Sequence, residues 1–214
     1  AVCTIGTGTD FSERDHFIGV WLIPFILCQF ALTEKIIIPK SLLITTLIVG
    51  SIFILIKPHF GILPTALLFV RMVQHKKFLK IILDIDFLIL SAITLIYLIV
   101  ISLFFHDYAL NIFPDVLALY LKTSKDISSV LKPATDYIIA YILLIIMELF
   151  LEDIKGSKKK LVLTVYICGA LALIPYFVQM KGFSYHLIPT YTLMIIGVSL
   201  SIMYRLEKHI KLPP

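Results

Sequence analysis

Long apolar segments alternate along the chain with short groups of charged residues and with proline or glycine breaks. A helix that crosses the hydrocarbon core of a membrane needs about 20 mostly apolar residues. The third segment is short by this measure and carries Pro64 in its first turn, so we expect it to be tilted, partly buried or re-entrant. The pattern predicts an all-α transmembrane helical bundle of about seven spans, a single membrane domain over residues 1–214. The segments are residues 16–32, 41–56, 61–75, 85–105, 136–151, 161–180 and 187–204.

The composition supports a membrane environment. Of the 214 residues, 59% are hydrophobic and only 15% are charged, and the mean hydropathy is +0.99. A soluble domain of this length exposes more polar surface than this chain contains. Cys3, Cys28 and Cys168 form no close pair, so the sequence shows neither a disulfide framework nor a zinc-site spacing.

Residues 106–136 form the longest connection between predicted spans. Within this outer loop, residues 109–121 are apolar and include aromatic side chains, but they are too few to cross a membrane. We expect them to form a helix that lies at the membrane interface.

The distribution of lysine and arginine predicts the orientation of the bundle. With the N-terminal segment outside and the C-terminus inside, 13 of the 19 basic residues fall in inside segments and 6 in outside segments. Membrane proteins carry more basic residues on the cytoplasmic side, so topology explains the net charge of +5. The chain shows no continuous basic surface of the kind that binds DNA or RNA, and we expect no nucleic-acid partner.

Four polar clusters fall on the outer face in this orientation. They are "DFSERDH" at residues 10–16, "KPHF" at 57–60, "FHDYALNIFPD" at 105–115 and "KGFSYH" at 181–186. Connections on one face can meet in the folded protein, and ionisable residues clustered at a membrane boundary form a functional-site hypothesis. The sequence therefore predicts a shared site on the outer face.

The first cluster has two interpretations. Ser12 and Asp15 fit a capping box at the start of a helix, where acids are favoured. Arg14 and His16 are not needed for capping, because the positive end of the helix dipole disfavours cations there. We interpret Glu13, Arg14 and His16 as candidates for the shared site.

Lysine and histidine in two other clusters are candidate phosphate ligands. Lys57 and His59 form either an ordinary interfacial turn or a cationic hairpin that holds a phosphate or pyrophosphate. Tyr185 alone is typical of an interfacial aromatic belt, whereas its neighbours Lys181 and His186 favour a binding site.

Asp107 is a candidate for acid–base chemistry or metal ligation, together with His106 and Asp115. The alternative is that each of them caps a helix or anchors it among lipid headgroups. No glycine-rich nucleotide loop, H-E-x-x-H, G-x-S-x-G or Cys/His metal pattern occurs in the chain. The cofactor is therefore unidentified, with a divalent cation as an open candidate.

The order of the four clusters resembles that in bacterial proteins of the type C glycosyltransferase superfamily, multi-span enzymes that use polyprenyl-phosphate sugars. Those proteins share a Glu-Arg-(Glu/Asp)-His string, a Lys-Pro-His/Tyr-Phe hairpin, an outer loop with Pro and Tyr, and a Lys-Gly-Phe/Trp-x-Tyr-His loop. The resemblance covers about residues 10–200. The matching stretches are Glu13–His16, Lys57–Phe60, Asp107 and Tyr108 with Pro114, Asp115 and Tyr120, and Lys181–His186.

The resemblance implies a helical bundle in the bacterial inner (cytoplasmic) membrane with its active site on the extracytoplasmic face. The donor would be a polyprenyl-phosphate sugar among the membrane lipids, and the acceptor a glycan or a lipid-linked glycan. Such a reaction needs a carboxylate base and cations at headgroup depth. The candidate catalytic residues are Glu13, Asp15 and Asp107. The candidate substrate- and phosphate-binding residues are Arg14, His16, Lys57, His59, Lys181, Tyr185 and His186.

One departure from the family pattern concerns the catalytic carboxylate, which in the superfamily usually comes from the first outer loop. We expect the chain, which begins at Ala1, to be the C-terminal portion of a longer or split protein, with the missing N-terminal half as a partner chain. The acids of residues 10–15 would then contact donor or acceptor instead of acting as the base.

A second class of function stays open. The chain is alternatively a non-enzymatic transporter, a flippase-like protein or an assembly subunit that binds lipid headgroups. An enzyme needs a carboxylate near Lys57 and Lys181 and a groove open to the lipid. A transporter needs polar residues that continue through the bundle, and the sequence shows few of them.

Overall fold

The computed structural model describes residues 14–76 and 81–209, and within these ranges every regular element is helical. The predicted all-α class is therefore confirmed. Three short turns, η2 (Pro58–Gly61), η3 (Tyr108–Ile112) and η4 (Ser184–Leu187), join some of the helices. The α-helices described here are α2 (Arg14–Glu34), α3 (Lys40–Ile56), α4 (Ile62–His75), α6 (Ile85–Phe104), α7 (Phe113–Lys122), α8 (Ile127–Phe150), α9 (Gly156–Leu171), α10 (Leu173–Gln179) and α11 (Ile188–His209).

Five helical stretches of the described chain are long and apolar enough to cross a membrane. The 17 residues of α3 and the 14 of α4 also match predicted segments, but they rise only about 26 Å and 21 Å. These two helices are too short to establish the predicted total of about seven spans. Helix α4 corresponds to the third predicted segment, which was expected to be short. The five stretches are Phe17–Glu34, Ile85–Phe104, Ile127–Phe150, Gly156–Gln179 and Ser184–Glu207.

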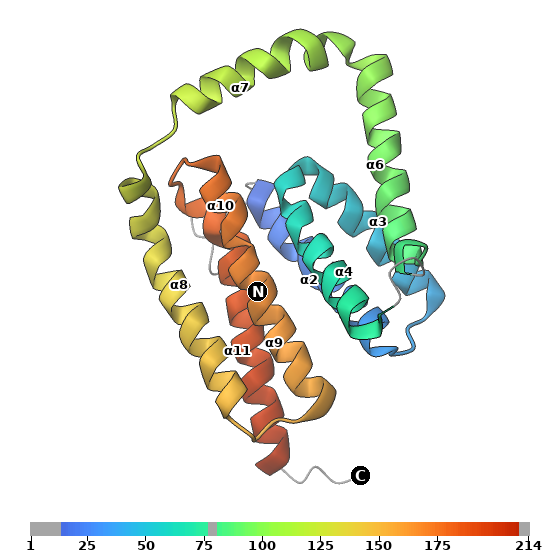
Figure 1. The fold of residues 1–214 in the computed structure, drawn as a ribbon, viewed down its shortest axis with the longest axis vertical. Coiled ribbons are helices and arrows are strands. Elements are labelled where there is room, and N and C mark those ends of the chain that lie inside the picture. Colours follow the sequence, from blue (N-terminus) through green and yellow to red (C-terminus); the bar gives the residue numbers. More distant parts are fainter. Residues whose placement is uncertain (1–13, 77–80, 210–214) are drawn as a thin grey trace.

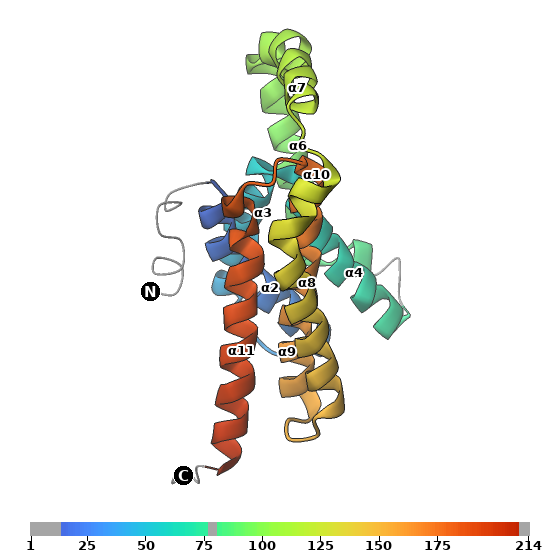
Figure 2. The ribbon, with the colours of Figure 1, turned by 90° about the vertical axis from the view of Figure 1, so that its left-hand side faces the viewer.

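Helices α9 and α11 pack against each other at the centre of the bundle (Figures 1 and 2). On one side of this pair lie α2, α3 and α4, with α6 packed on α3, and on the other side lies α8, while α10 continues from the end of α9 (Figure 1). One apolar core, which includes Phe25 and Leu63, fills the first side. A second core, which includes Tyr141 and Tyr176, fills the other. Burial of these side chains holds both sides to the central pair.

Close helix contacts occur where a glycine faces an aromatic ring on a neighbouring helix. A Cβ on Gly169 of α9 would collide with Tyr141 of α8, and a Cβ on Gly197 of α11 would collide with Tyr166 of α9. Small residues of this kind let membrane helices approach closely. The Tyr141 hydroxyl also donates a hydrogen bond to the carbonyl oxygen of Thr190 at 2.6 Å, which ties α8 to α11.

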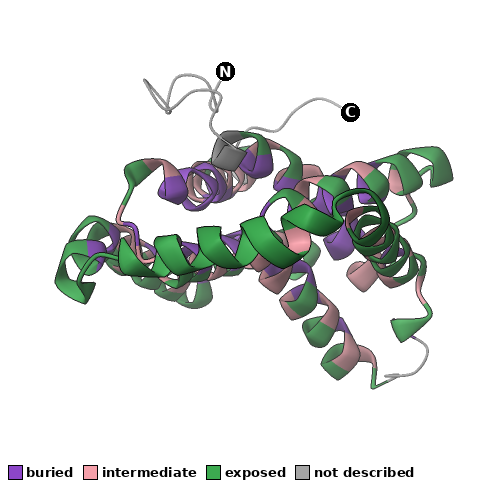
Figure 3. Ribbon diagram, turned by 90° about the horizontal axis from the view of Figure 1, so that it is seen from above, coloured by how far each residue is buried: buried purple, intermediate pink, exposed green. Residues whose placement is uncertain are grey.

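The connection from α6 to α8 forms an exposed arch over one end of the bundle (Figures 1 and 3). The helix predicted over residues 109–121 is present there as η3 and α7, with most of its side chains exposed. Its position at a membrane interface stays a prediction. We call the end of the bundle below α7, where α2, α4, α8 and α11 begin, the arch end, and the opposite end the far end.

Candidate functional site

Three polar connections meet at the arch end (Figure 1). One follows α3, one joins α7 to α8, and one joins α10 to α11. Helix α2 begins beside the third of them, because α2 and η4 are in contact. The arch end therefore holds the polar clusters at residues 57–60 and 181–186. It also holds the start of α2, in which the cluster at residues 10–16 ends.

The turn after α3 directs Lys57 into the bundle. Pro58 lacks an N–H and occupies the first turn of η2, so α3 ends at Ile56. Phe60 is completely buried in the apolar core and fixes the turn, while His59 packs on its ring at a centroid distance of 5.3 Å. Lys57 is consequently only 7% exposed, although a lysine at a helix end usually reaches toward water.

Two residues with left-handed backbone shape the connection after α10. Met180 has a φ of 50° and Gly182 a φ of 63°, a conformation that glycine adopts without cost. The chain therefore turns back on the bundle. Behind this turn the rings of Phe183 and Tyr185 stack at a centroid distance of 5.3 Å, and His186 is only 3% exposed.

Lys57 and His186 are in direct contact. The Nζ of Lys57 lies 3.3 Å from Nδ1 of His186 and 6.0 Å from the centre of the Tyr185 ring. An ammonium group can only donate, so Nδ1 is the acceptor and a neutral imidazole here carries its hydrogen on Nε2. The Tyr185 ring packs edge-on against this imidazole at 4.2 Å between centroids. The structure thus brings three of the predicted binding residues together.

The connection from α7 to α8 adds residues that the sequence did not single out. The Nζ of Lys181, which is 5% exposed, donates a hydrogen bond to Oγ1 of Thr123 at 2.6 Å. The N–H of Lys125 donates to the carbonyl oxygen of Met180 at 2.8 Å, and its Nζ lies 5.2 Å from the centre of the Phe183 ring. No sequence signal identifies Thr123, because its contact depends on how the arch returns to the bundle.

Asp126 caps α8 next to this connection. Its carboxylate accepts hydrogen bonds from the hydroxyl groups of Ser128 and Ser129 and from the N–H of Ser129 at 3.1 Å. These bonds, of which that from the Ser128 hydroxyl has the largest effect, lower the pKa of Asp126 to about 2. The carboxylate therefore holds the start of α8 in its ionised form and is poorly suited to act as a base.

The remaining candidates of the first cluster lie at the start of α2. Arg14, Asp15 and His16 form its first turn. Further along this helix, a Cβ on Gly19 would lie 3.5 Å from Cα of Pro189, so the beginnings of α2 and α11 run side by side. Glu13 lies outside the described residues, as do the side chains of the other three candidates.

Asp107 lies apart from these residues. It is exposed at the beginning of the arch, and its Oδ1 accepts a hydrogen bond from Nδ2 of Asn111 at 2.6 Å. The turn that follows it, η3, contacts α6 and α7. The structure does not bring Asp107 to Lys57 and His186, and its contacts are those expected of a residue that organises a local helical turn.

An apolar groove of about 600 Å³ lies between α3 and α6. Ile56, the residue before Lys57, is part of its wall, so the groove reaches the turn that carries this cation. A volume of this size is typical of ligand pockets. The groove is lined by Ile52, Leu55 and Ile56 from α3 and by Ile93, Ile96, Tyr97 and Val100 from α6.

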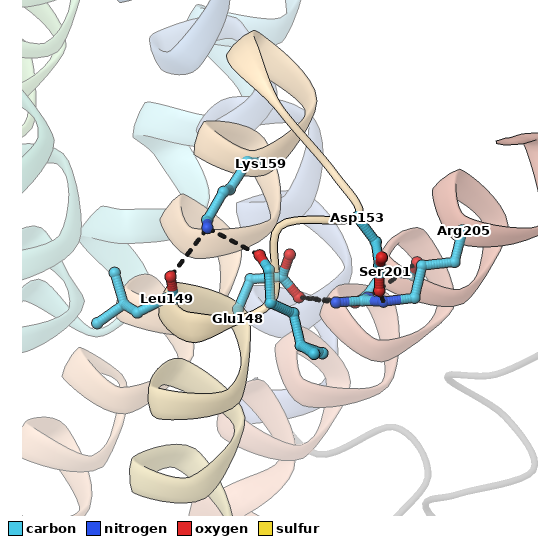
Figure 4. Close-up of polar contacts among 7 residues, drawn as sticks. Glu148, Leu149, Asp153, Lys159, Ser201 and Arg205 are labelled. Carbon is cyan, nitrogen blue, oxygen red and sulfur yellow. Dashed lines mark hydrogen bonds and ion pairs between the residues drawn. The ribbon is translucent and has the colours of Figure 1, made fainter.

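A second buried polar cluster lies at the far end (Figure 4). Glu148 of α8 is completely buried, and its Oε2 accepts hydrogen bonds from Oγ of Ser201 at 2.8 Å and from Nη2 of Arg205 at 3.1 Å. Asp153 lies 3.8 Å from Nε of Arg205, and Lys159 donates to carbonyl groups at the end of α8. These contacts join α8 to α11, and they explain the cluster as a structural element.

The chemistry available at the arch end is binding of an anion by lysine and histidine. Within residues 14–76 and 81–209, no group of three or more His, Cys, Asp or Glu side chains is arranged to hold a metal ion. Comparison with known proteins does not place the chain in a family, because no family model, no curated protein and no solved structure matches it.

Proposed function

We propose that the chain is a glycosyltransferase, or its C-terminal half, that binds a polyprenyl-phosphate sugar at the arch end. The buried contact between Lys57 and His186 carries this proposal. A lipid phosphate needs cations at headgroup depth, and its isoprenoid chain needs an apolar surface beside them. Lys57, Lys125 and Lys181 supply the cations, and the groove between α3 and α6 supplies the apolar surface.

The proposed location is the bacterial inner membrane, with several spans and with the arch end on the extracytoplasmic face. The excess of basic residues in the segments that lead to the far end supports this orientation. The C-terminus then lies inside, and lipid-linked sugars of the outer leaflet reach the groove from the side.

In the proposed reaction, a hydroxyl group of the glycan acceptor attacks C1 of the donor sugar, and the bond between C1 and the phosphate oxygen breaks. The polyprenyl phosphate leaves with the bonding electrons, and Lys57 and Lys181 stabilise its charge. A carboxylate takes the hydroxyl proton. We assign that role to Glu13, to Asp15 in the first turn of α2, or to a carboxylate of the N-terminal half.

A binding experiment with matched probes tests the proposal. The purified chain in mixed micelles is titrated with polyprenyl phosphate and, separately, with the uncharged polyprenol of the same length. We expect polyprenyl phosphate to bind at least tenfold more tightly, because a hydrogen bond to a charged group contributes about 1.5–3 kcal/mol. Lys57→Gln should remove most of this difference, whereas Lys132→Gln, at an exposed lysine near the start of α8, should leave it unchanged.

Two results would decide against the proposal. Equal binding of polyprenol and polyprenyl phosphate would show that the chain has no phosphate site. An undiminished preference of Lys57→Gln for polyprenyl phosphate would show that Lys57 does not bind the phosphate. If phosphate-dependent binding is present, incubation with a labelled polyprenyl-phosphate sugar, a glycan acceptor and the N-terminal half tests for transfer. Binding without any transfer would favour a transporter or an assembly subunit instead.

A further inference from the structure

A cavity of about 490 Å³ lies at the far end, between the ends of α2 and α4 and the start of α6. It is remote from the arch end, because α4 separates the two along its length. Its volume is within the range of small-molecule pockets. Polar or charged side chains form most of one wall, and these are Lys35, Arg71, Gln74, His75 and Asp84.

Arg71 is the central cation of this cavity. It is 2% exposed, and its Nη2 donates to both carboxylate oxygens of Asp86, at 2.8 and 2.7 Å. Its Nε and Nη1 have no hydrogen-bond partner among the residues that the structure describes. A buried donor without a partner costs about 1–3 kcal/mol, and more when it is charged. Both atoms have almost no accessible surface, so acceptor oxygens of a ligand would remove this cost once the guanidinium turns toward the cavity that it lines.

Other polar side chains line the same space. Lys35 is exposed and ends α2 with a φ of 57°, which turns the chain at the edge of the cavity. The Nε2 of His75 donates a hydrogen bond to the carbonyl oxygen of Thr33 at 2.9 Å, which fixes the ring beside the cavity. The amide of Gln74 is a further donor, shared with Glu34 at 3.3 Å.

The balance of charge limits the kind of anion. Lys35 and Arg71 are opposed by Asp86 behind the guanidinium and by Asp84, whose Oδ2 lies 3.7 Å from Nη2 of Arg71. Among the residues that the structure describes, the charges around the cavity therefore balance, and the two carboxylates disfavour a doubly charged anion more than a singly charged one. A phosphodiester meets this condition, and its oxygens can accept hydrogen bonds from the guanidinium donors that Asp86 does not use.

We propose that this cavity binds a phosphodiester, held by Arg71 and Lys35. Helices long enough to cross a membrane end beside it, so a phospholipid headgroup is one source, and a soluble phosphodiester is the other. The site is independent of the proposed glycosyltransferase site, since the two share no residue.

Native mass spectrometry of the full chain in detergent tests the proposal with three probes. Phosphatidylglycerol carries the phosphodiester and the acyl chains, glycerophosphoglycerol carries the phosphodiester alone, and diacylglycerol carries the chains alone. We expect phosphatidylglycerol to bind at least tenfold more tightly than diacylglycerol. Binding of glycerophosphoglycerol with similar affinity would identify a soluble ligand, and its failure to bind would identify the lipid.

Variants connect the binding to the cavity. Lys35→Gln should weaken phosphatidylglycerol binding at least fivefold, and Lys40→Gln, at an exposed lysine of the same end that does not line the cavity, should not. Arg71→Gln alone leaves Asp86 buried and uncompensated. The pair Arg71→Gln and Asp86→Asn avoids this problem and should abolish the preference for phosphate. Equal binding of phosphatidylglycerol and diacylglycerol, or unchanged binding in Lys35→Gln, would overturn the proposal.

Discussion

The buried ion pair between Glu148 and Arg205 is expected to hold α8 to α11, and Arg205→Met tests this. The Glu148 side chain is completely buried, whereas that of Arg205 is 21% exposed. The substitution removes the cation and leaves a buried carboxylate whose Oε2 keeps only the hydrogen bond from Ser201. The perturbation therefore acts mainly through the desolvated partner that stays behind.

The structure sets the size of the effect. Removing one partner of a fully buried pair costs about 3–5 kcal/mol, and the partial exposure of Arg205 places this pair near about 3 kcal/mol. For a chain of this size, about 1 kcal/mol lowers the midpoint of thermal unfolding by roughly 2–4 °C. We therefore expect Arg205→Met to lower the unfolding midpoint in detergent by about 6–12 °C.

The far end contains a matched control. Lys158 and Glu207 form an ion pair at 2.8 Å between α9 and α11, but both side chains are 49% exposed. Exposed pairs contribute about 0–1 kcal/mol, so Lys158→Met should lower the midpoint by less than about 4 °C. Combining Glu148→Gln with Arg205→Met should restore much of the loss. If Arg205→Met behaves like Lys158→Met, the pair does not hold the two helices together.

Two further predictions concern helix packing and capping. Gly169→Ala places a Cβ against Tyr141 and should destabilise the folded chain by about 1–3 kcal/mol, which is measured as a lower unfolding midpoint. Gly61→Ala is the control, because the nearest atom to its new Cβ lies 3.9 Å away, and this variant should be neutral or slightly more stable. Because the pKa of Asp126 is lowered to about 2, its capping of α8 should be complete above its ordinary value near 3.8 and lost as the pH falls through about 2. Titration of this carboxyl group by NMR would show a midpoint near the ordinary value of 3.8 if the cap were absent.

The helices were predictable to the extent that hydrophobicity determined them. Segments 16–32 and 41–56 differ from α2 and α3 by only a few residues at each end. The segment expected over 136–151 begins instead at Ile127, because the Asp126 cap starts a helix that continues through Lys132 and Pro133. A prediction based on apolar segments alone misses the polar first turns of a helix.

The candidate site was predictable only where connections share an end of the bundle. Lys57 and His186 were expected to meet because their connections fall on one face, and they lie in contact. Asp107 was assigned to the same face, but the arch carries it away from them. The buried pairs of Arg71 and Glu148 were not predicted, because a charged residue near the end of an apolar run usually marks a span boundary. Their partners, Asp86 and Arg205, lie on other helices, and only the folded structure shows the contacts of Arg71 with Asp86 and of Glu148 with Arg205.

The short separation of Lys57 and Arg71 is consistent with the polar partners that both cations have inside the bundle. The chain between them consists of η2 and most of α4, which span at most about 20–25 Å along the helix axis. The hydrocarbon core of a bilayer is about 30 Å thick, and any tilt of α4 shortens the distance along the membrane normal. In a bilayer, the backbone of at least one of the two residues therefore lies within the apolar layer, and its long side chain must extend along the membrane normal to bring the charge to headgroup depth. Such a cation requires polar partners from the protein, as Arg71 has in Asp86 and Lys57 has in His186. If the Lys57 and Lys35 variants each abolish binding of a different phosphate probe, the chain holds anions at both ends of one short helix.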